Sequence, residues 1–251
     1  MSLREIAARS LPLVDLTNLT DDCTSADIEA LCAKAVTPHG HVAAICIYSR
    51  FIKDAVPLLK GTGVKIATVV NFPGGGEDTG AVERETAEAI AAGADEIDLV
   101  MPYEAFLAGR HGFAETQIVR VKRVCGATTL KVILETGRLM LPEAIRGASD
   151  LAIAAGADFI KTSTGKVEIN ATPHAARIML AAIKTSGRPV GFKAAGGVRT
   201  TAEAGNYLAL ADEIMGADWV SPATFRFGAS GLLTDLIAQL DGTSAAVTAG
   251  Y

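Results

Sequence analysis

Three copies of the tripeptide Gly-Ala-Asp recur along the chain, and their spacing constrains the fold more than any other feature. They begin at Gly93, Gly156 and Gly216, so successive copies are 63 and 60 residues apart. Each glycine ends a helical pattern, where glycine adopts a left-handed cap at little cost, and each copy then enters a short apolar run typical of a buried strand. A period of this size is too long for one βα unit but fits two of about 30 residues each.

Apolar runs fall where about eight such units need strands, and they predict a single-domain (β/α)8 barrel, also called a TIM barrel. The expected strands are Leu13–Leu16, Ala43–Ile47, Lys65–Val70, Glu96–Val100, Leu130–Leu134, Phe159–Lys161, Val190–Ala194 and Trp219–Ser221. Helical patterns lie between them, for example Thr24–Ala35, Ala81–Ala91 and Pro173–Lys184. A doubly wound open sheet is the alternative. We expect residues 1–240 to form the barrel and residues 241–251 to form a mobile C-terminal tail.

Composition and charge narrow the function classes. The chain is 49% hydrophobic and 20% charged, enough to bury a large core. Its net charge of −5 argues against a nucleic-acid partner. The absence of a long apolar run argues against a signal peptide or a membrane span. Four cysteines without a CxxC spacing predict a reduced, cytoplasmic protein, and His39 and His41 alone do not predict a metal site.

Charged residues interrupt the apolar strands at matching positions. Asp98, Lys161 and Ser221 each lie three residues beyond the aspartate of a Gly-Ala-Asp copy, on the fourth, sixth and eighth expected strands. Alternate strands of such a barrel share a layer of inward side chains, so we expect these three to meet near the C-terminal end. A desolvated lysine near a second cation, here Lys193 on the seventh strand, becomes a nucleophile able to form a Schiff base. A structural ion pair between Lys161 and Asp98 is the equally weighted alternative.

Glycine-rich segments follow the last three expected strands. They are Thr164–Lys166, Gly196–Arg199 and Arg226–Gly231. Phosphate sites in such barrels use the loops after the seventh and eighth strands together with a helix N-terminus, and Arg199 or Lys166 supplies positive charge. Ordinary tight turns are the alternative. Asn71–Gly76 also resembles a phosphate loop, but we interpret it as a simple turn.

Three further polar or reactive residues lie on expected strands. Lys131 and Glu135 share one parity on the fifth strand, which predicts either a network beside Lys161 or a buried ion pair near the rim. Cys46 on the second strand is interpreted as a small core residue.

These segments together resemble the deoxyribose-phosphate aldolases, a family of class I, Schiff-base aldolases. The matching segments are Asp15–Thr17, Ala44–Tyr48, Asn71–Pro73, Gly93–Asp98, Lys131–Gly137, Phe159–Lys166, Gly191–Arg199 and Arg226–Ser230. They span nearly the whole chain, and the order of the two lysine segments is specific to the family.

The resemblance implies a reaction and a set of site residues. The reaction is the reversible cleavage of 2-deoxy-D-ribose 5-phosphate to acetaldehyde and D-glyceraldehyde 3-phosphate, in deoxyribonucleoside catabolism. Lys161 matches the Schiff-base lysine, Lys193 the second lysine and Asp98 the acid/base carboxylate. Substrate-binding positions are matched by Asp15, Thr17, Gly165, Lys166, Gly196, Gly197, Arg199 and Ser230. No metal and no cofactor are expected, since the imine serves as the electron sink.

Two positions at the end of the chain qualify the resemblance. Gly231 stands where some members have a second serine, so one phosphate contact is expected to be absent. Tyr251 matches the terminal tyrosine of family members and is expected to assist proton transfer. The alternative interpretation is that Tyr251 is simply a solvated terminal residue.

Two other functions remain open at this point. One is another Schiff-base barrel that transfers a three-carbon unit, and the other is a non-catalytic barrel that binds a sugar phosphate. The set of Asp98, Lys161 and Lys193 favours catalysis, because a binding protein has little use for two converging lysines. The partner is a small sugar phosphate, and the oligomeric state is open, with a homodimer or a higher homo-oligomer as the candidates.

Overall fold

A computed structural model describes residues 1–243, within which eight parallel strands close into one barrel. The barrel strands are β1 (Val14–Asn18), β4 (Ala44–Ile47), β5 (Lys65–Val70), β6 (Glu96–Val100), β7 (Thr129–Ile133), β8 (Phe159–Lys161), β9 (Gly191–Ala195) and β10 (Phe225–Ala229). Each strand pairs with the next, and β1 pairs with β10 to close the ring. This closure confirms the predicted TIM barrel and excludes the open doubly wound sheet.

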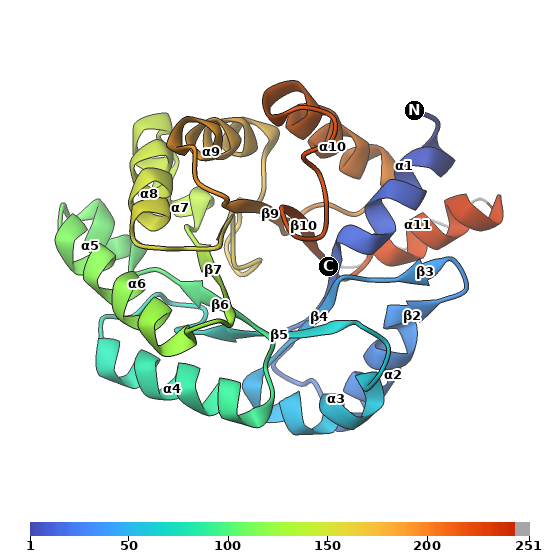
Figure 1. Cartoon of the computed structure of the whole chain (residues 1–251), viewed down its shortest axis with the longest axis horizontal. Coiled ribbons are helices and arrows are strands. Elements are labelled where there is room, and N and C mark those ends of the chain that lie inside the picture. The colour runs from blue at the N-terminus through green and yellow to red at the C-terminus, as the bar shows by residue number, and fades with distance from the viewer. Residues whose placement is uncertain (244–251) are drawn as a thin grey trace.

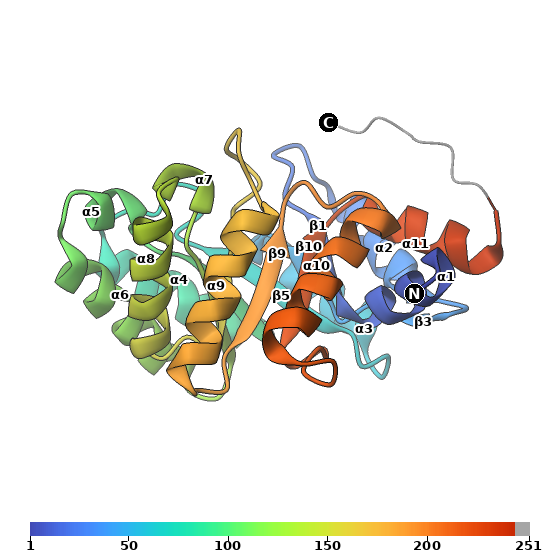
Figure 2. The same ribbon diagram turned by 90° about the horizontal axis from the view of Figure 1, so that it is seen from above.

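Helices surround the barrel on its outer face (Figure 1). They are α1 (Leu3–Ser10), α2 (Ser25–Ala35), α3 (Ile52–Leu59), α4 (Thr79–Ala92), α5 (Tyr103–Leu107), α6 (His111–Cys125), α7 (Thr136–Leu139), α8 (Pro142–Ala154), α9 (Pro173–Ser186), α10 (Thr201–Met215) and α11 (Leu232–Asp241). Helices α8, α9 and α10 pack side by side along one flank (Figure 2). The short strands β2 (Val36–Thr37) and β3 (Gly40–His41) form a separate antiparallel hairpin.

Local sequence signals place the helix ends. Thr24 caps α2 through a capping box with Asp27, and Thr172 caps α9 by accepting a hydrogen bond from the Ala175 amide. Gly93 ends α4 with φ of 113°, a left-handed conformation that glycine adopts without a Cβ penalty. The expected helices therefore form within two residues of their predicted ends.

The core lies between the strands and the helices. Outward residues such as Ile97 and Leu99 on β6 are fully buried against the helices. Inward residues at the alternate positions include charged groups, among them Asp98 and Glu96. The interior of the barrel therefore contains charged groups, whereas its outer face is apolar.

The predicted eighth strand at Trp219–Ser221 is wrong. The strand begins at Phe225, and the residues before it form a turn in which the Thr224 hydroxyl hydrogen-bonds with Ser221. Gly216 has ψ of 151°, unlike the left-handed Gly93, so this copy of the repeat does not lead into a strand. Pro222 also removes a backbone donor that a central strand needs. Ser221 consequently lies outside the barrel interior.

The expected boundary between barrel and tail lies close to the end of α11. This helix ends at Asp241, and Gly242 caps it in the left-handed conformation. The rest of the predicted tail, including Tyr251, lies outside the described residues.

Candidate active site

Lys161 occupies the last position of β8, at the C-terminal end of the barrel. Its side chain points inward and is almost fully buried, and its Nζ donates a hydrogen bond to Asp98 Oδ2 at 2.8 Å. Asp98 is the third residue of β6, so two alternate strands bring the pair together as the sequence predicts.

Lys193 approaches the same carboxylate oxygen from β9. Its Nζ donates to Asp98 Oδ2 at 2.8 Å, so the Nζ atoms of Lys161 and Lys193 lie within twice that distance of each other. Lys161 and Lys193 are also partners in the register of β8 and β9. On the neighbouring β10, Gly228 leaves room for the lysine, because a Cβ there would lie 3.0 Å from Lys193 Cε.

The two lysines differ in the direction of their pKa shifts. Burial lowers the pKa of Lys161, and the positive charge of Lys193 lowers it further, against the opposing pull of Asp98. Burial also acts to lower the pKa of Lys193, but Asp15 and Asp98 outweigh it and raise that pKa. Lys161 is therefore the readier of the two to lose its proton and act as a nucleophile.

Asp98 stays ionised in this setting. Burial acts to raise its pKa, but the ammonium groups of Lys131, Lys161 and Lys193 hold the pKa well below its usual range. A carboxyl group with so low a pKa is a weak base and, once protonated, a strong acid. Such a group releases readily any proton that it takes up.

Lys131 lies on β7 and does not pair with Glu135, contrary to one reading of their parity. Its Nζ contacts Asp98 Oδ1 at 2.8 Å and Glu96 Oε2 at 2.5 Å. Glu135 follows the end of β7 in a left-handed conformation, with φ of 58°, so the strand alternation no longer applies to it. Its carboxylate instead accepts a hydrogen bond from the Thr164 hydroxyl at 2.5 Å.

Two residues that the sequence analysis did not single out complete the charged interior. Arg226, the second residue of β10, donates to Glu96 Oε1 at 2.8 Å and to Asp15 Oδ1 at 2.7 Å. The Gly-Ala-Asp repeat predicts an eighth strand that ends at Ser221, which would put Arg226 in the loop after it, whereas Arg226 lies within β10. The alternation of Phe225, Arg226 and Phe227 is the period-two pattern that identifies the strand.

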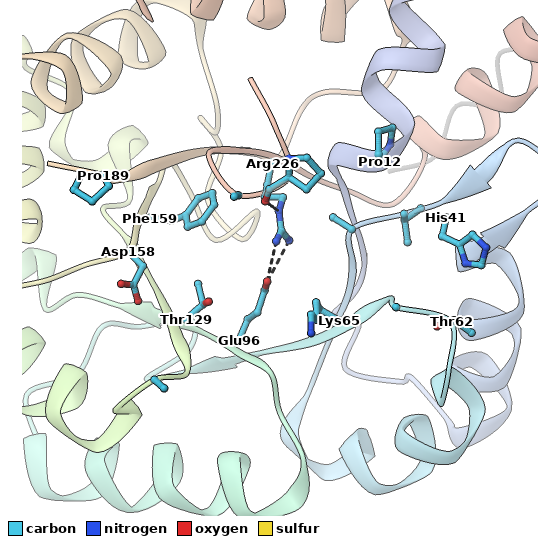
Figure 3. A pocket seen from close by; sticks show the side chains of 16 residues that line it. Pro12, His41, Thr62, Lys65, Glu96, Thr129, Asp158, Phe159, Pro189 and Arg226 are labelled. Atoms are coloured by element: carbon cyan, nitrogen blue, oxygen red, sulfur yellow. Dashed lines mark hydrogen bonds and ion pairs between the residues drawn. The ribbon is translucent and has the colours of Figure 1, made fainter. Parts of the chain in front are cut away.

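The pair of Arg226 and Glu96 lies at the N-terminal ends of the strands, which we call the floor of the barrel. Figure 3 shows the two side chains facing each other at a pocket of about 740 Å³. The pocket is lined by residues at strand starts, including Lys65, Thr129 and Phe159. It therefore opens at the end of the barrel opposite Lys161.

The two positions matched to sugar contacts lie on β1. Asp15 is fully buried, and its carboxylate is held by Lys193 and Arg226. Thr17 is partly exposed and donates to the Asp15 carbonyl at 2.8 Å. In this structure Asp15 belongs to the charged interior, while Thr17 lies further toward the C-terminal end.

The positions matched to phosphate contacts gather at the end of the barrel that holds Lys161. Gly165 and Lys166 follow β8, Gly196, Gly197 and Arg199 follow β9, and Ser230 follows β10. All of these except Gly196 are exposed. Gly196 and Gly197 have φ of 78° and 88°, so this turn requires the left-handed backbone that glycine allows.

Three other sequence expectations have a structural counterpart. Cys46 is fully buried inside the barrel, and burial raises the pKa of its thiol, as fits a core residue. Asn71–Gly76 forms a turn in which the Asn71 side chain donates to the Gly76 carbonyl at 3.0 Å. His39 lies beside Asp241, with Nε2 and Oδ1 2.6 Å apart.

Residues 1–243 contain no cluster of three ligating side chains suited to a metal ion. Nor does any helix within them have the length and apolarity to cross a membrane.

Comparison with known proteins identifies relatives along the whole chain. A family model described as DeoC/LacD family aldolase matches residues 9–233. The deoxyribose-phosphate aldolase of Agrobacterium fabrum is 53% identical over 251 residues, covering 99% of this chain and 97% of the relative. The region that the family model matches contains all eight strands of the barrel.

Solved structures have the same fold. A candidate deoxyribose-phosphate aldolase from Toxoplasma gondii ME49 superposes with a TM-score of 0.89 at 26% identity, covering 97% of this chain and 99% of that one. The deoxyribose phosphate aldolase of Aeropyrum pernix, described as tetrameric, has a TM-score of 0.76 at 23% identity, covering 94% and 92% of the two chains. The likeness to the Aeropyrum pernix structure supports the fold alone.

Proposed function

The chain belongs to the DeoC/LacD family of aldolases, and from this membership we propose that it cleaves 2-deoxy-D-ribose 5-phosphate through a Schiff base on Lys161. It is a carbon–carbon lyase. The products of the reversible reaction are acetaldehyde and D-glyceraldehyde 3-phosphate. One observation carries the proposal: Lys161 is a buried lysine with a lowered pKa, beside a second lysine, at the C-terminal end of the barrel.

The first step uses the neutral amine of Lys161. Its nitrogen attacks the C1 aldehyde of the open-chain sugar, and loss of water leaves a protonated imine. Lys193 keeps its proton because Asp15 and Asp98 raise its pKa. Lys193 thus supplies the positive charge that helps to keep Lys161 neutral before the attack.

The second step breaks the bond between C2 and C3. The C3 hydroxyl loses its proton and becomes the aldehyde of glyceraldehyde 3-phosphate, while the bonding electrons move into the imine to form an enamine. The enamine C2 then takes up a proton, and water releases acetaldehyde from Lys161. We assign Asp98, acting through water, as the proton carrier, since its low pKa favours release of a proton to the enamine carbon.

Substrate binding is assigned to the loops around Lys161. Gly165, Lys166, Gly196, Gly197, Arg199 and Ser230 would hold the phosphate. Backbone N–H groups at the glycines and the N-terminus of α11 suit an anion, and Arg199 and Lys166 add charge. Fixing the phosphate places the aldehyde end of the sugar near Lys161. Thr17 and Asp15 would face the sugar hydroxyls.

The experiment that tests the proposal is trapping of the imine. The protein is incubated with acetaldehyde or deoxyribose 5-phosphate, reduced with borohydride and mapped by mass spectrometry. The adduct is expected on Lys161 and is lost in Lys161→Ala, while Lys166→Ala retains it. An adduct on Lys193 or Lys166, or activity that EDTA removes and zinc restores, would overturn the mechanism.

Tyr251 is assigned an accessory role on the sequence resemblance alone. A phenol at the active site would assist protonation of the enamine carbon. Tyr251→Phe is expected to slow turnover and the exchange of acetaldehyde methyl protons with solvent, while trapping at Lys161 persists. If turnover and exchange keep their wild-type rates, the residue has no part in the reaction.

The wider setting is also part of the proposal. We infer a role in deoxyribonucleoside catabolism in the cytoplasm, supported by the identity of the substrate and by four cysteines that are all free and buried. A homodimer or higher homo-oligomer is the assembly we expect, the Aeropyrum pernix protein being described as tetrameric, and analytical ultracentrifugation tests it.

A further inference from the structure

The charged side chains inside the barrel form one connected network from the floor to Lys161. We call it the interior network, and it consists of Asp15, Glu96, Asp98, Lys131, Lys161, Lys193 and Arg226. Glu96 binds both Arg226 and Lys131, Lys131 binds Asp98, and Asp98 binds Lys161. A second route runs from Arg226 through Asp15 and Lys193 to Asp98.

The interior network has one positive charge too many. Among the residues that the structure describes, it holds three carboxylates against three lysines and one arginine. Lys131, Lys193 and Arg226 each contact at least two of the carboxylates. Within the same described part, Lys161 contacts Asp98 alone. Loss of the Lys161 proton therefore makes the network electrically neutral. Lys161 is also the cation in the network with the fewest carboxylates to stabilise its charge.

We propose that Glu96 and Arg226, at the floor, are positioning residues that set the charge state of Lys161 at the opposite end of the barrel. The proposal deepens the proposed function, because it rests on Lys161 being the Schiff-base lysine. Neither floor residue has a contact with Lys161 itself. They act through Lys131, Asp15 and Asp98. Glu96 contacts Lys131, Arg226 contacts Asp15, and Lys131 contacts Asp15.

The titratable and charged groups around Lys161 fall into two sets. Asp98 on β6, Lys131 on β7, Lys193 on β9 and Asp15 on β1 belong to the interior network itself. Cys46 on β4 and Glu135 after β7 complete the titratable groups, and burial raises the pKa of each. Neither of the two contacts Glu96 or Arg226.

The two floor residues carry opposite charges, so neutralising them has opposite effects. Glu96→Gln increases the positive excess, which lowers the pKa of Lys161 and lets the neutral amine persist to lower pH. Arg226→Met removes the excess, so Lys161 keeps its proton to higher pH. Each shift is expected to be about one pH unit, the effect of a unit charge about 10 Å away at an effective dielectric constant of about 20.

The test measures the pH midpoint at which acetaldehyde forms a borohydride-trapped adduct on Lys161. We expect the midpoint to fall in Glu96→Gln, to rise in Arg226→Met, and to lie between those of the two single variants in the double variant, because the two charges removed are opposite. Arg226→Lys keeps the charge and is expected to keep the wild-type midpoint. If Arg226→Met does not fold, the fall of the midpoint in Glu96→Gln tests the inference by itself.

A matched pair on the outer face provides the control. Glu213→Gln and Arg177→Met remove an exposed ion pair between α10 and α9, with Nη1 and Oε1 2.7 Å apart, and should leave the midpoint unchanged. Equal midpoints in wild type and both floor variants, or shifts of the same sign in both, would overturn the inference. Absence of any Lys161 adduct in the wild type would instead overturn the proposed function, so the two failures are distinguishable.

Discussion

The two ends of the barrel interior satisfy their charges in different ways. At the floor, Arg226 lies between Asp15 and Glu96, and Glu96 also binds Lys131, so each cation there meets at least two carboxylates. At the opposite end, Lys161 shares the single carboxylate of Asp98 with two other lysines. Both ends are buried, so exposure to water does not explain the difference.

Lys131 and Lys161 make the comparison sharpest, because they lie on adjacent strands. Burial acts to lower the pKa of both. For Lys131, the carboxylates of Asp98, Glu96 and Asp15 reverse that effect and raise the pKa. For Lys161, Asp98 alone does not reverse the effect of burial, and the pKa is lowered. The number of carboxylates around a buried lysine, rather than burial itself, thus sets the direction of its pKa shift.

The largest expected effect comes from making the same substitution at both lysines. Lys131→Met removes the buried cation that contacts both Glu96 and Asp98, leaving Arg226 as the one cation on Glu96 within residues 1–243, and is expected to destabilise the fold by about 3–5 kcal/mol. Lys161→Met removes the surplus cation and should leave stability near that of wild type. Urea denaturation at pH 7 measures both. Equal losses of stability in the two variants would show that the two ends do not differ in this way.

A second test removes the partners of Lys161. Lys193→Leu takes away the neighbouring positive charge, so the pKa of Lys161 should rise and activity should begin only at higher pH, since the amine must be neutral. Asp98→Asn keeps the size of the side chain but removes the proton carrier. Each is expected to lower kcat by at least about 10²-fold.

Steady-state kinetics between pH 5 and 9 provide the measurement for both variants. Lys53→Leu, on the exposed face of α3, serves as the control for loss of a lysine. A kcat near that of wild type in either variant would remove that residue from the mechanism.

A third test concerns the exposed rim beside Lys161. Arg199→Ala removes a charge from the loop after β9, and we expect KM for deoxyribose 5-phosphate to rise by about 10- to 100-fold, with little change for deoxyribose. Lys166→Ala should act in the same direction. Assays with the two sugars in parallel separate phosphate binding from catalysis, and an equal change for both sugars would place the phosphate elsewhere.

The smallest expected effect is a gain of function at Gly231. This glycine is the N-cap of α11, has φ of −91°, and has no atom within 4 Å of a Cβ built there, so serine fits without strain. Gly231→Ser supplies a hydroxyl at the phosphate end of the site and should lower KM by a few-fold. It should stabilise the helix by a few tenths of a kcal/mol. An unchanged KM would show that the second serine of other family members is dispensable here.

Most of the barrel could be predicted because its strands follow a repeated local pattern. Seven of the eight expected strands overlap observed strands of residues 1–243, and the meeting of Asp98 with Lys161 follows from their equal positions on alternate strands. The eighth failed because the third Gly-Ala-Asp copy has a local sequence like the others. The turn before the observed strand is closed by Thr224, five residues after position 219, where the strand was expected to begin. Contacts that the repeat does not encode set this turn.

The network at the floor could not be read from the sequence for a related reason. Arg226 and Glu96 are 130 residues apart, and their pairing depends on the correct placement of β10. Glu96 appeared only as the first residue of an apolar strand. The parity of Lys131 and Glu135 also misled, because the strand alternation ends at Ile133 and the backbone turns at Glu135.

The interior network also bears on how the chain folds. Asp15 lies on the first strand, and the two cations that hydrogen-bond with it, Lys193 and Arg226, are 178 and 211 residues further along. A partly folded chain that lacks the last two strands would bury Asp15 with only the more distant Lys131, 3.6 Å away, at a cost of several kcal/mol. Incomplete barrels are therefore penalised, which favours an all-or-none folding transition. Lys161 acquires its charged neighbours in the same event, so a chain with an open barrel would be unstable and would lack the environment that lowers the pKa of Lys161.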